Sequence, residues 1–256
     1  MSVPAVRRPT LEEWFLELQL RAIVREHVHN PLATSFDVSR IRAVWGDRRP
    51  PWTAIGVRAV GMLARAHPNL NRMAFRTPIG RRVVDFPYVT VNVPVLLRRS
   101  GHVGACLVAR TDERTVEEIA TQLATFRETE LRDLPVGRYF EGQRNTWWNR
   151  GQLRLMHWAA YALPWFYVRG GGGGVSVSSL LNHRAAPAVH GVALGPTGLT
   201  FTLTAVREEG GRTLLDVGIA MDHTILTGNE VWEGMTTLRR ILEGGEGLAP
   251  LDPICR

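Results

Sequence analysis

This chain of 256 residues contains no lysine: all 31 of its Lys and Arg residues are arginine. Without lysine the chain cannot form a Schiff base, carry a lipoyl group, or supply the lysine of a phosphate-binding loop. Arginine suits phosphorylated or acidic partners, and the formal net charge is +7. The arginines are scattered and form no stripe with interleaved aromatic residues, so nucleic acid is not an expected partner.

Cysteines and long apolar runs are also scarce. Cys106 and Cys255 cannot build a disulfide framework or a four-thiolate zinc site. His27 and His29 lack partners at metal-ligand spacing, so we expect no metal. No apolar run reaches the roughly 18–20 residues of a membrane span. The first residues lack the apolar core of a secretory signal. These absences predict a cytoplasmic protein without a membrane span.

Five of the 25 glycines form one uninterrupted run, Gly170–Gly174. No lysine follows it and Val175 interrupts the Gly-x-Gly-x-x-Gly spacing, so it is not a nucleotide-binding loop. It indicates a flexible connection or closely packed backbone before a strand. A Gly-x-Ser-x-Gly motif is missing as well, which argues against an α/β-hydrolase.

Helices and strands are expected along the whole chain. Two capping boxes, at 10–13 and 115–118, predict helix starts. Pro31 should end the first helix, and Pro94 indicates an edge position or a bulge in its strand. The expected helices span 10–29, 52–66, 115–131 and 153–161, with a last one after Gly228. The expected strands span 33–38, 83–86, 88–97, 103–109, 175–182, 189–194, 199–206 and 213–220.

The most informative stretch begins at Leu214 and ends at Gly228. An apolar, strand-like run ends in Asp222-His223, and a short turn with Thr227 and Gly228 precedes an amphipathic helix. A buried strand that delivers one histidine at its end holds the imidazole still. A neutral imidazole is the side chain best suited to accept a proton near neutral pH.

This run resembles the catalytic signature of the acyltransferase domain of 2-oxo acid dehydrogenase complexes and of chloramphenicol acetyltransferase. That signature is His, three residues, Asp or Asn, then Gly, directly before a helix. His223 and Gly228 match it, whereas Thr227 replaces the acid. Asp222 is adjacent and charged, but neighbouring strand residues point to opposite faces, so it is not an obvious substitute.

A second segment, 175–182, is similar to the family strand that follows a glycine-rich turn. The resemblance implies that Ser178, which lies 45 residues before His223, donates a hydrogen bond to the oxyanion. Ser179 takes that role if the register shifts by one residue.

The resemblance covers roughly residues 10 to 243 and is weak over 132–169. It implies a two-layer α/β sandwich with a mixed sheet, arranged as a homotrimer with active sites at subunit interfaces. We expect one catalytic domain over 1–243 and a loosely ordered tail over 244–256. No lipoyl domain or subunit-binding domain is recognisable, so the chain looks like a stand-alone member.

The implied reaction is acyl transfer by general base catalysis. His223 deprotonates an acceptor, which attacks the thioester of acetyl-CoA or of an acyl-carrier protein. The weakly preferred acceptor is a small-molecule hydroxyl of a natural-product intermediate, for example a tetronate. Two alternatives stay open: an inactive trimeric binding or scaffold protein, which Thr227 favours, and a repurposed cyclase or eliminase that uses the same histidine.

The segment 132–169 carries an excess of aromatic residues. Large aromatic side chains most often belong to a core or a subunit contact. A segment of this kind could also line an acceptor pocket or a membrane-facing surface, and the sequence leaves these uses open.

Overall fold

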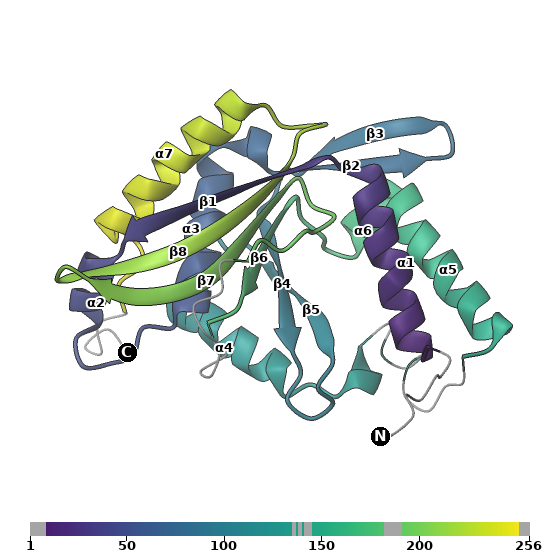
Figure 1. Ribbon diagram of the computed structural model, residues 1–256, viewed down its shortest axis with the longest axis horizontal. Coiled ribbons are helices and arrows are strands. Elements are labelled where there is room, and N and C mark those ends of the chain that lie inside the picture. Colours follow the sequence, from purple (N-terminus) through teal and green to yellow (C-terminus); the bar gives the residue numbers. More distant parts are fainter. Residues whose placement is uncertain (1–8, 135–136, 138–139, 141–144, 182–190, 251–256) are drawn as a thin grey trace, which may run out of the picture.

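A computed structural model describes residues 9–134, 137, 140, 145–181 and 191–250 (Figure 1). Within these residues, six strands form one mixed sheet in the order β1-β8-β7-β6-β4-β5, and two more form a separate hairpin. The sheet strands are β1 (His29–Asp37), β4 (Thr90–Leu96), β5 (Val103–Ala109), β6 (Val175–Ser179), β7 (Leu199–Glu209) and β8 (Arg212–Asp222). The hairpin strands are β2 (Arg72–Thr77) and β3 (Gly80–Asp85). The α-helices are α1 (Leu11–Glu26), α2 (Ser39–Trp45), α3 (Trp52–Ala66), α4 (Val116–Arg127), α5 (Trp147–Ala162), α6 (Pro164–Arg169) and α7 (Gly228–Gly244).

One face of the sheet packs against helices, of which α3 and α7 lie closest to the core (Figure 1). Alternate strand residues point toward these helices and are buried there, including Val177, Phe201 and Ile219. The side chains between them, such as Ser178 and Thr202, point to the opposite face. This arrangement confirms the predicted two-layer α/β fold with a mixed sheet.

A second, smaller core joins α1 to α5 at the end of the molecule where α6 also lies (Figure 1). Leu11 and Phe15 of α1 pack on Leu153 of α5. The β2–β3 hairpin buries Phe75 beside Tyr167 of α6. The segment that resembles the family least therefore builds its own layer beside the sheet.

The glycine run is closely packed. A Cβ atom on Gly173 would lie 2.0 Å from the carbonyl oxygen of Thr90, and one on Gly174 would lie 2.4 Å from the backbone nitrogen of Arg72. No side chain fits at either position, so of the two predicted roles the closely packed backbone is correct.

Several sequence predictions hold, and others are wrong for identifiable reasons. The helix 52–66 and the strand 103–109 have the predicted bounds. The first helix ends at Glu26 rather than His29, and Pro31 lies inside β1. Proline is tolerated there because β1 is an edge strand that pairs only with β8.

Pro94 is not on an edge strand, because β4 lies between β5 and β6. The pairing with β6 covers only Val91 and Asn92, so the missing N–H of Pro94 breaks no ladder on that side. The prediction of a strand at 189–194 is wrong for residues 191–194, which are irregular. Residues 189 and 190 lie outside the described residues. The hairpin strand β2 and the helix α2 were not predicted.

The chain beyond α7 packs for a few residues more. Leu248 is fully buried, and its carbonyl oxygen accepts a hydrogen bond from Nε1 of Trp45 at 3.1 Å. Residues 251–256 lie outside the described residues. A single domain over 1–243 with a loose tail over 244–256 stays a prediction.

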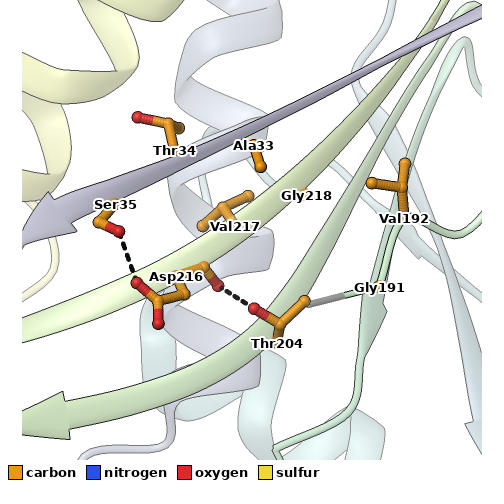
Figure 2. Close-up of a pocket in the computed structure, with 9 residues that line it drawn as sticks. All are labelled: Ala33, Thr34, Ser35, Gly191, Val192, Thr204, Asp216, Val217 and Gly218. Atoms are coloured by element: carbon orange, nitrogen blue, oxygen red, sulfur yellow. Dashed lines mark hydrogen bonds between the residues drawn. The ribbon is translucent and has the colours of Figure 1, made fainter. Parts of the chain in front are cut away.

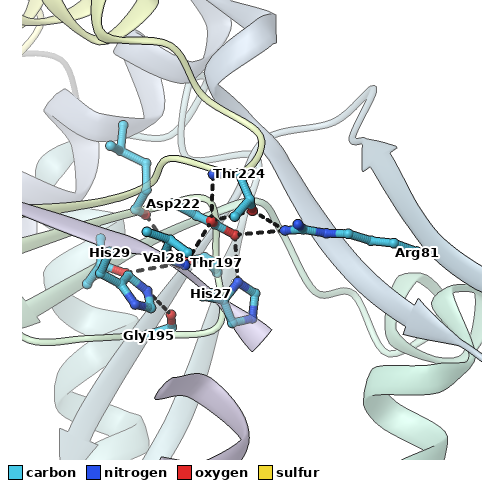
Figure 3. Close-up of polar contacts among 10 residues, drawn as sticks. His27, Val28, His29, Arg81, Gly195, Thr197, Asp222 and Thr224 are labelled. Carbon is cyan, nitrogen blue, oxygen red and sulfur yellow. Dashed lines mark hydrogen bonds and ion pairs between the residues drawn. The ribbon is translucent and has the colours of Figure 1, made fainter. Parts of the chain in front are cut away.

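Asp222, the last residue of β8, is fully buried and joins three segments (Figure 3). Its Oδ2 accepts a hydrogen bond from Nδ1 of His27 at 2.7 Å, and Nη2 of Arg81 on β3 lies 3.5 Å away. Its Oδ1 accepts from the backbone N–H of Thr224 at 3.0 Å. Burial alone raises the pKa of Asp222, but the hydrogen bonds from His27 and Thr224 outweigh it and lower the pKa to about 2.

Asp222→Asn should lower the free energy of unfolding at pH 7 by about 2–3 kcal/mol, because hydrogen bonds to a charged group contribute about 1.5–3 kcal/mol. The lowered pKa places this stabilisation above pH 3.8, and it is lost as the pH falls toward 2. Urea unfolding at stepwise lower pH should therefore show the two proteins converging in that window. The surface variant Asp133→Asn is the control and should differ from wild type by no more than about 0.5 kcal/mol. A difference that persists unchanged to pH 2 contradicts the prediction.

Candidate active site

His223 stands at the exposed end of a buried strand. Its backbone N–H donates to the carbonyl oxygen of Val28 at 2.8 Å, which fixes the main chain beside the start of β1. The side chain is exposed. Its Nε2 lies 3.0 Å from Nδ2 of Asn30 on β1. An amide N–H only donates, so Nε2 accepts in this contact. The imidazole is therefore exposed and is held in place by one amide.

Asp222 does not contact this imidazole. It points to the other face of the sheet, where it bonds His27, as the alternation of strand residues requires. Its contribution to the site is to hold the turn, since its Oδ1 bonds the backbone of Thr224, the residue after His223. Asp222 is therefore a support for the histidine and not its hydrogen-bond partner.

The other end of the same turn is held by Arg72, which begins β2. Its Nη1 donates to the carbonyl oxygen of Ile225 at 3.3 Å and lies 3.6 Å from Oε1 of Glu230. The turn that carries His223 is thus tied down on both sides by charged groups. A histidine held in this way keeps its position while its ring stays accessible.

Thr227, at the position where the resemblance expects an acid, is the N-cap of α7. Its side chain accepts from the N–H of Glu230, and Oε2 of Glu230 accepts from the N–H of Thr227 at 2.8 Å. Oε1 of Glu230 also accepts from Nδ2 of Asn69 at 3.1 Å. The pKa of Glu230 is lowered, first by the N–H of Thr227 and then by Asn69, with a smaller contribution from Arg72. Gly228 begins the helix, and a Cβ atom there would meet nothing, so no contact explains this glycine.

The two predicted serines lie on opposite faces of β6. Ser179 points toward the helices, where its Oγ lies 2.9 Å from Oγ1 of Thr53 on α3. Ser178 points to the opposite face and is half-buried, and no residue of the described part of the chain forms a hydrogen bond with its hydroxyl. Of the two, Ser178 has the free hydroxyl that an oxyanion donor needs.

Ser178 and His223 do not meet within one chain. Ser178 is in register with Thr202, and Thr202 with Gly218, which lies five residues before His223. At about 3.4 Å per residue and about 4.8 Å per strand spacing, the two side chains are roughly 20 Å apart. A site that uses both must combine residues from two copies of the chain.

A cavity of about 230 Å³ lies on the face of the sheet that Ser178 shares (Figure 2). Gly218 and Thr204 line it, together with the buried carboxylate of Asp216. Asp216 accepts a hydrogen bond from Oγ of Ser35 at 2.5 Å and pairs with Nε of Arg207 at 2.9 Å. A cavity of this size with hydroxyl and carboxylate oxygens suits a small polar molecule.

A second cavity of about 210 Å³ lies between the α2–α3 connection and the β7–β8 hairpin. Arg42, Arg49 and the indole of Trp52 line it, beside Glu208 of β7. Two guanidinium groups and an aromatic ring can hold a phosphate and a flat ring together. The carboxylate of Asp47 lines it as well, and Trp52 directly precedes Thr53, which bonds Ser179 of β6.

No group of three or more His, Cys, Asp or Glu side chains in the described part of the chain could hold a metal ion. His27 bonds Asp222, and Nε2 of His29 donates to the carbonyl oxygen of Gly195 at 3.0 Å. Burial lowers the pKa of His29. Both rings therefore brace the end of the sheet.

Four supporting residues were missed by the sequence analysis: Asn30, Arg72, Asn69 and Glu230. Only Glu230 left a local signal, since Thr227-x-x-Glu230 is itself a capping box. The others come from distant parts of the chain and depend on strand register.

No protein-family model matches this sequence, and no curated protein sequence matches it either. Solved structures do match. The cubic core of a pyruvate dehydrogenase multienzyme complex aligns with 96% of this chain and 94% of its own, at 14% identity and a TM-score of 0.65.

Dihydrolipoamide acetyltransferase of Azotobacter vinelandii gives the same coverage and identity with a TM-score of 0.66. A serine, a histidine and an asparagine have been studied for their role in that enzyme's catalytic mechanism. Chloramphenicol acetyltransferase aligns with 95% of this chain and 99% of its own, at 10% identity and a TM-score of 0.50. The resemblance inferred from the sequence is thus confirmed at the level of the fold, and the chain has the fold of the acyltransferase cores of 2-oxo acid dehydrogenase complexes and of chloramphenicol acetyltransferase.

Proposed function

We propose that this protein is an acyltransferase in which His223 is the general base and Ser178 of a neighbouring copy donates to the oxyanion. The observation that carries the proposal is the placement of His223. Its imidazole is exposed and bonded to Asn30, while the turn beneath it is held by Asp222 on one side and by Arg72 and Glu230 on the other. Such support is what a base that must stay in position requires.

The reaction proceeds by direct transfer. Nε2 of His223 exchanges its hydrogen bond with Asn30 for one with the acceptor hydroxyl, and removes that proton as the acceptor oxygen bonds to the thioester carbonyl carbon. The carbonyl oxygen becomes an oxyanion that Ser178 stabilises, and one such donor lowers the barrier by about 3 kcal/mol. When the carbon–sulfur bond breaks, the imidazolium returns the proton to the leaving thiolate. No covalent enzyme intermediate is formed.

The quaternary arrangement is a trimer with the active sites between copies. The roughly 20 Å that separate Ser178 from His223 in one chain support this proposal, because a closed ring of copies can bring the serine of one to the histidine of the next. Each ring of three then contains three equivalent sites.

The donor is acetyl-CoA or another acyl-thioester. The cavity at Arg42, Arg49 and Trp52 is suited to the phosphates and adenine of CoA. An acidic acyl-carrier protein is the second candidate donor. The cavity at Asp216 is the candidate site for a small hydroxylated acceptor, such as a natural-product intermediate.

An inactive binding or scaffold protein is the alternative, and Thr227 is the observation that favours it. The ion pair between Glu230 and Arg72 argues against this alternative, since it places a carboxylate beside the same turn.

His223→Ala should lower kcat by about 10²–10⁴-fold, because general base assistance contributes that much. The measurement is release of CoA from acetyl-CoA, or of free carrier thiol from acetylated carrier protein, with a panel of hydroxylated acceptors. Binding of acetyl-CoA, followed by calorimetry, should be unchanged in the variant. Donor binding without any thiol release by wild type supports the scaffold instead.

Mixing two inactive variants tests whether the site lies between copies. Ser178→Ala and His223→Ala should each be nearly inactive, whereas a mixture unfolded and refolded together at equal amounts should regain roughly one quarter of wild-type activity. In a cyclic trimer each interface pairs one serine with one histidine, and roughly one interface in four then has both. Refolding each variant alone is the control. A mixture as inactive as its components contradicts a shared site.

Glu230→Gln should lower kcat by about tenfold while leaving KM for the donor within about twofold, since it removes the charge opposite Arg72 but keeps a capping residue. Glu118→Gln is the matched control, because Glu118 closes the same capping box with Thr115 on α4. Both variants should lose similar stability in thermal unfolding, and only Glu230→Gln should lose activity. Equal activity in the two variants would show that Glu230 is only a helix cap.

A further inference from the structure

One face of α5 is covered with exposed apolar side chains. Trp147, Trp148, Leu155 and Trp158 are 81%, 59%, 64% and 48% exposed. At 100° per residue these four positions fall on one side of the helix. We call them the tryptophan face. Tryptophan is usually well buried in folded proteins, so three exposed indoles on one helix call for a ligand or partner.

The tryptophan face does not belong to the core. The side of α5 that packs inward carries Leu153, which is fully buried with Phe15 and Leu11 of α1. After Pro164, α6 adds two more exposed rings, Trp165 and Phe166.

The charged side chains in the segment that carries these rings are all positive. Residues 145–169 contain Arg150, Arg154 and Arg169 but no Asp or Glu. Arg154 is exposed on α5 with its guanidinium over the ring of Trp14 on α1 at 5.3 Å, and Arg169 stacks over Trp165 at 5.7 Å. The surface therefore combines wide aromatic rings with positive charge.

Acidic residues of α1, the helix packed against α5, do not cancel this charge because they are engaged elsewhere. Glu17 pairs with Arg21 at 2.6 Å, and Glu26 pairs with Arg76 at 2.8 Å. Glu13 accepts from the backbone N–H of Thr10 at 2.8 Å. Glu12 lies 2.5 Å from Nε2 of His102.

We propose that the tryptophan face docks on the surface of a bilayer that contains anionic lipids. Indole rings favour the boundary between headgroups and acyl chains, and arginine reaches back toward phosphates from the same depth. A helix with an aromatic face and a cationic flank lies in the plane of the interface. No helix among the described residues is long and apolar enough to cross a bilayer, so the contact is peripheral.

A two-fold contact with a second copy of this chain fits the surface less well. A two-fold contact through α5 would bring Arg154 and its neighbouring arginines against the same residues of the other copy, and like charges in contact oppose association. An anionic surface instead matches both the rings and the charge.

The experiment is co-sedimentation of the full-length protein with vesicles of phosphatidylcholine alone and with roughly one third phosphatidylglycerol. We expect binding to the anionic vesicles, weak binding to the neutral ones, a blue shift of tryptophan fluorescence on binding, and release at high salt. Wild-type protein that stays in the supernatant with both compositions overturns the proposal.

The double variant Trp147→Ser/Trp158→Ser should bind anionic vesicles at least about tenfold more weakly, since each buried indole removes a large apolar area from water. Trp232→Ser is the matched control, because Trp232 is 73% exposed on α7, away from this face. Circular dichroism and thermal unfolding should show all three proteins folded. Equal loss of binding in the control overturns the proposal. So does a change in molecular mass of the double variant in solution, which would assign the face to contact between copies.

Discussion

The structure around His223 depends on one buried carboxylate, that of Asp222. A charge removed from water must be fully paired, and Asp222 is paired by groups from the end of α1, from β3 and from the turn after β8. Each of these three segments loses a partner of the buried charge if it moves away. The same pairing that stabilises the sheet end therefore also fixes the backbone from which His223 projects, so stability and site geometry share one interaction.

Local patterns were sufficient where one segment alone determines its structure. The helix α3 has apolar residues at helical spacing with a proline before it and another just after it, and its bounds were predicted. The hairpin strand β2 has three consecutive buried residues, Met73, Ala74 and Phe75, because both of its sides are covered. Such a run lacks the period of two by which a strand is recognised. Pro31 likewise suggested a boundary, because only the sheet order reveals that β1 is an edge.

The candidate site likewise contains residues that a local sequence pattern identifies and residues that none identifies. His223 and Ser178 could be named from the sequence because each lies in a recognisable segment in the expected order. Asn30, which touches the imidazole, lies 193 residues from it in sequence. Arg72 holds the turn from 153 residues away. These contacts follow from the register of β1 on β8 and from the position of the β2–β3 hairpin. No local pattern encodes either, so the support of the site became visible only in three dimensions.

Thr227, at the position where the resemblance expects an acid, has a defined structural role as a helix cap. A carboxylate at this position would sit at the N-cap of α7 and would itself bond the first free N–H groups of the helix. Thr227 caps the helix with its hydroxyl, and the carboxylate three residues later bonds back to the N–H of Thr227 with one oxygen. Its other oxygen faces Arg72 and Asn69. Glu230 thus caps the helix and also pairs with Arg72, which Asp85 approaches at 3.2 Å from the other side of the hairpin base. The carboxylate of Glu230 lies three residues after Thr227, within one helical turn, and beside the turn that carries His223.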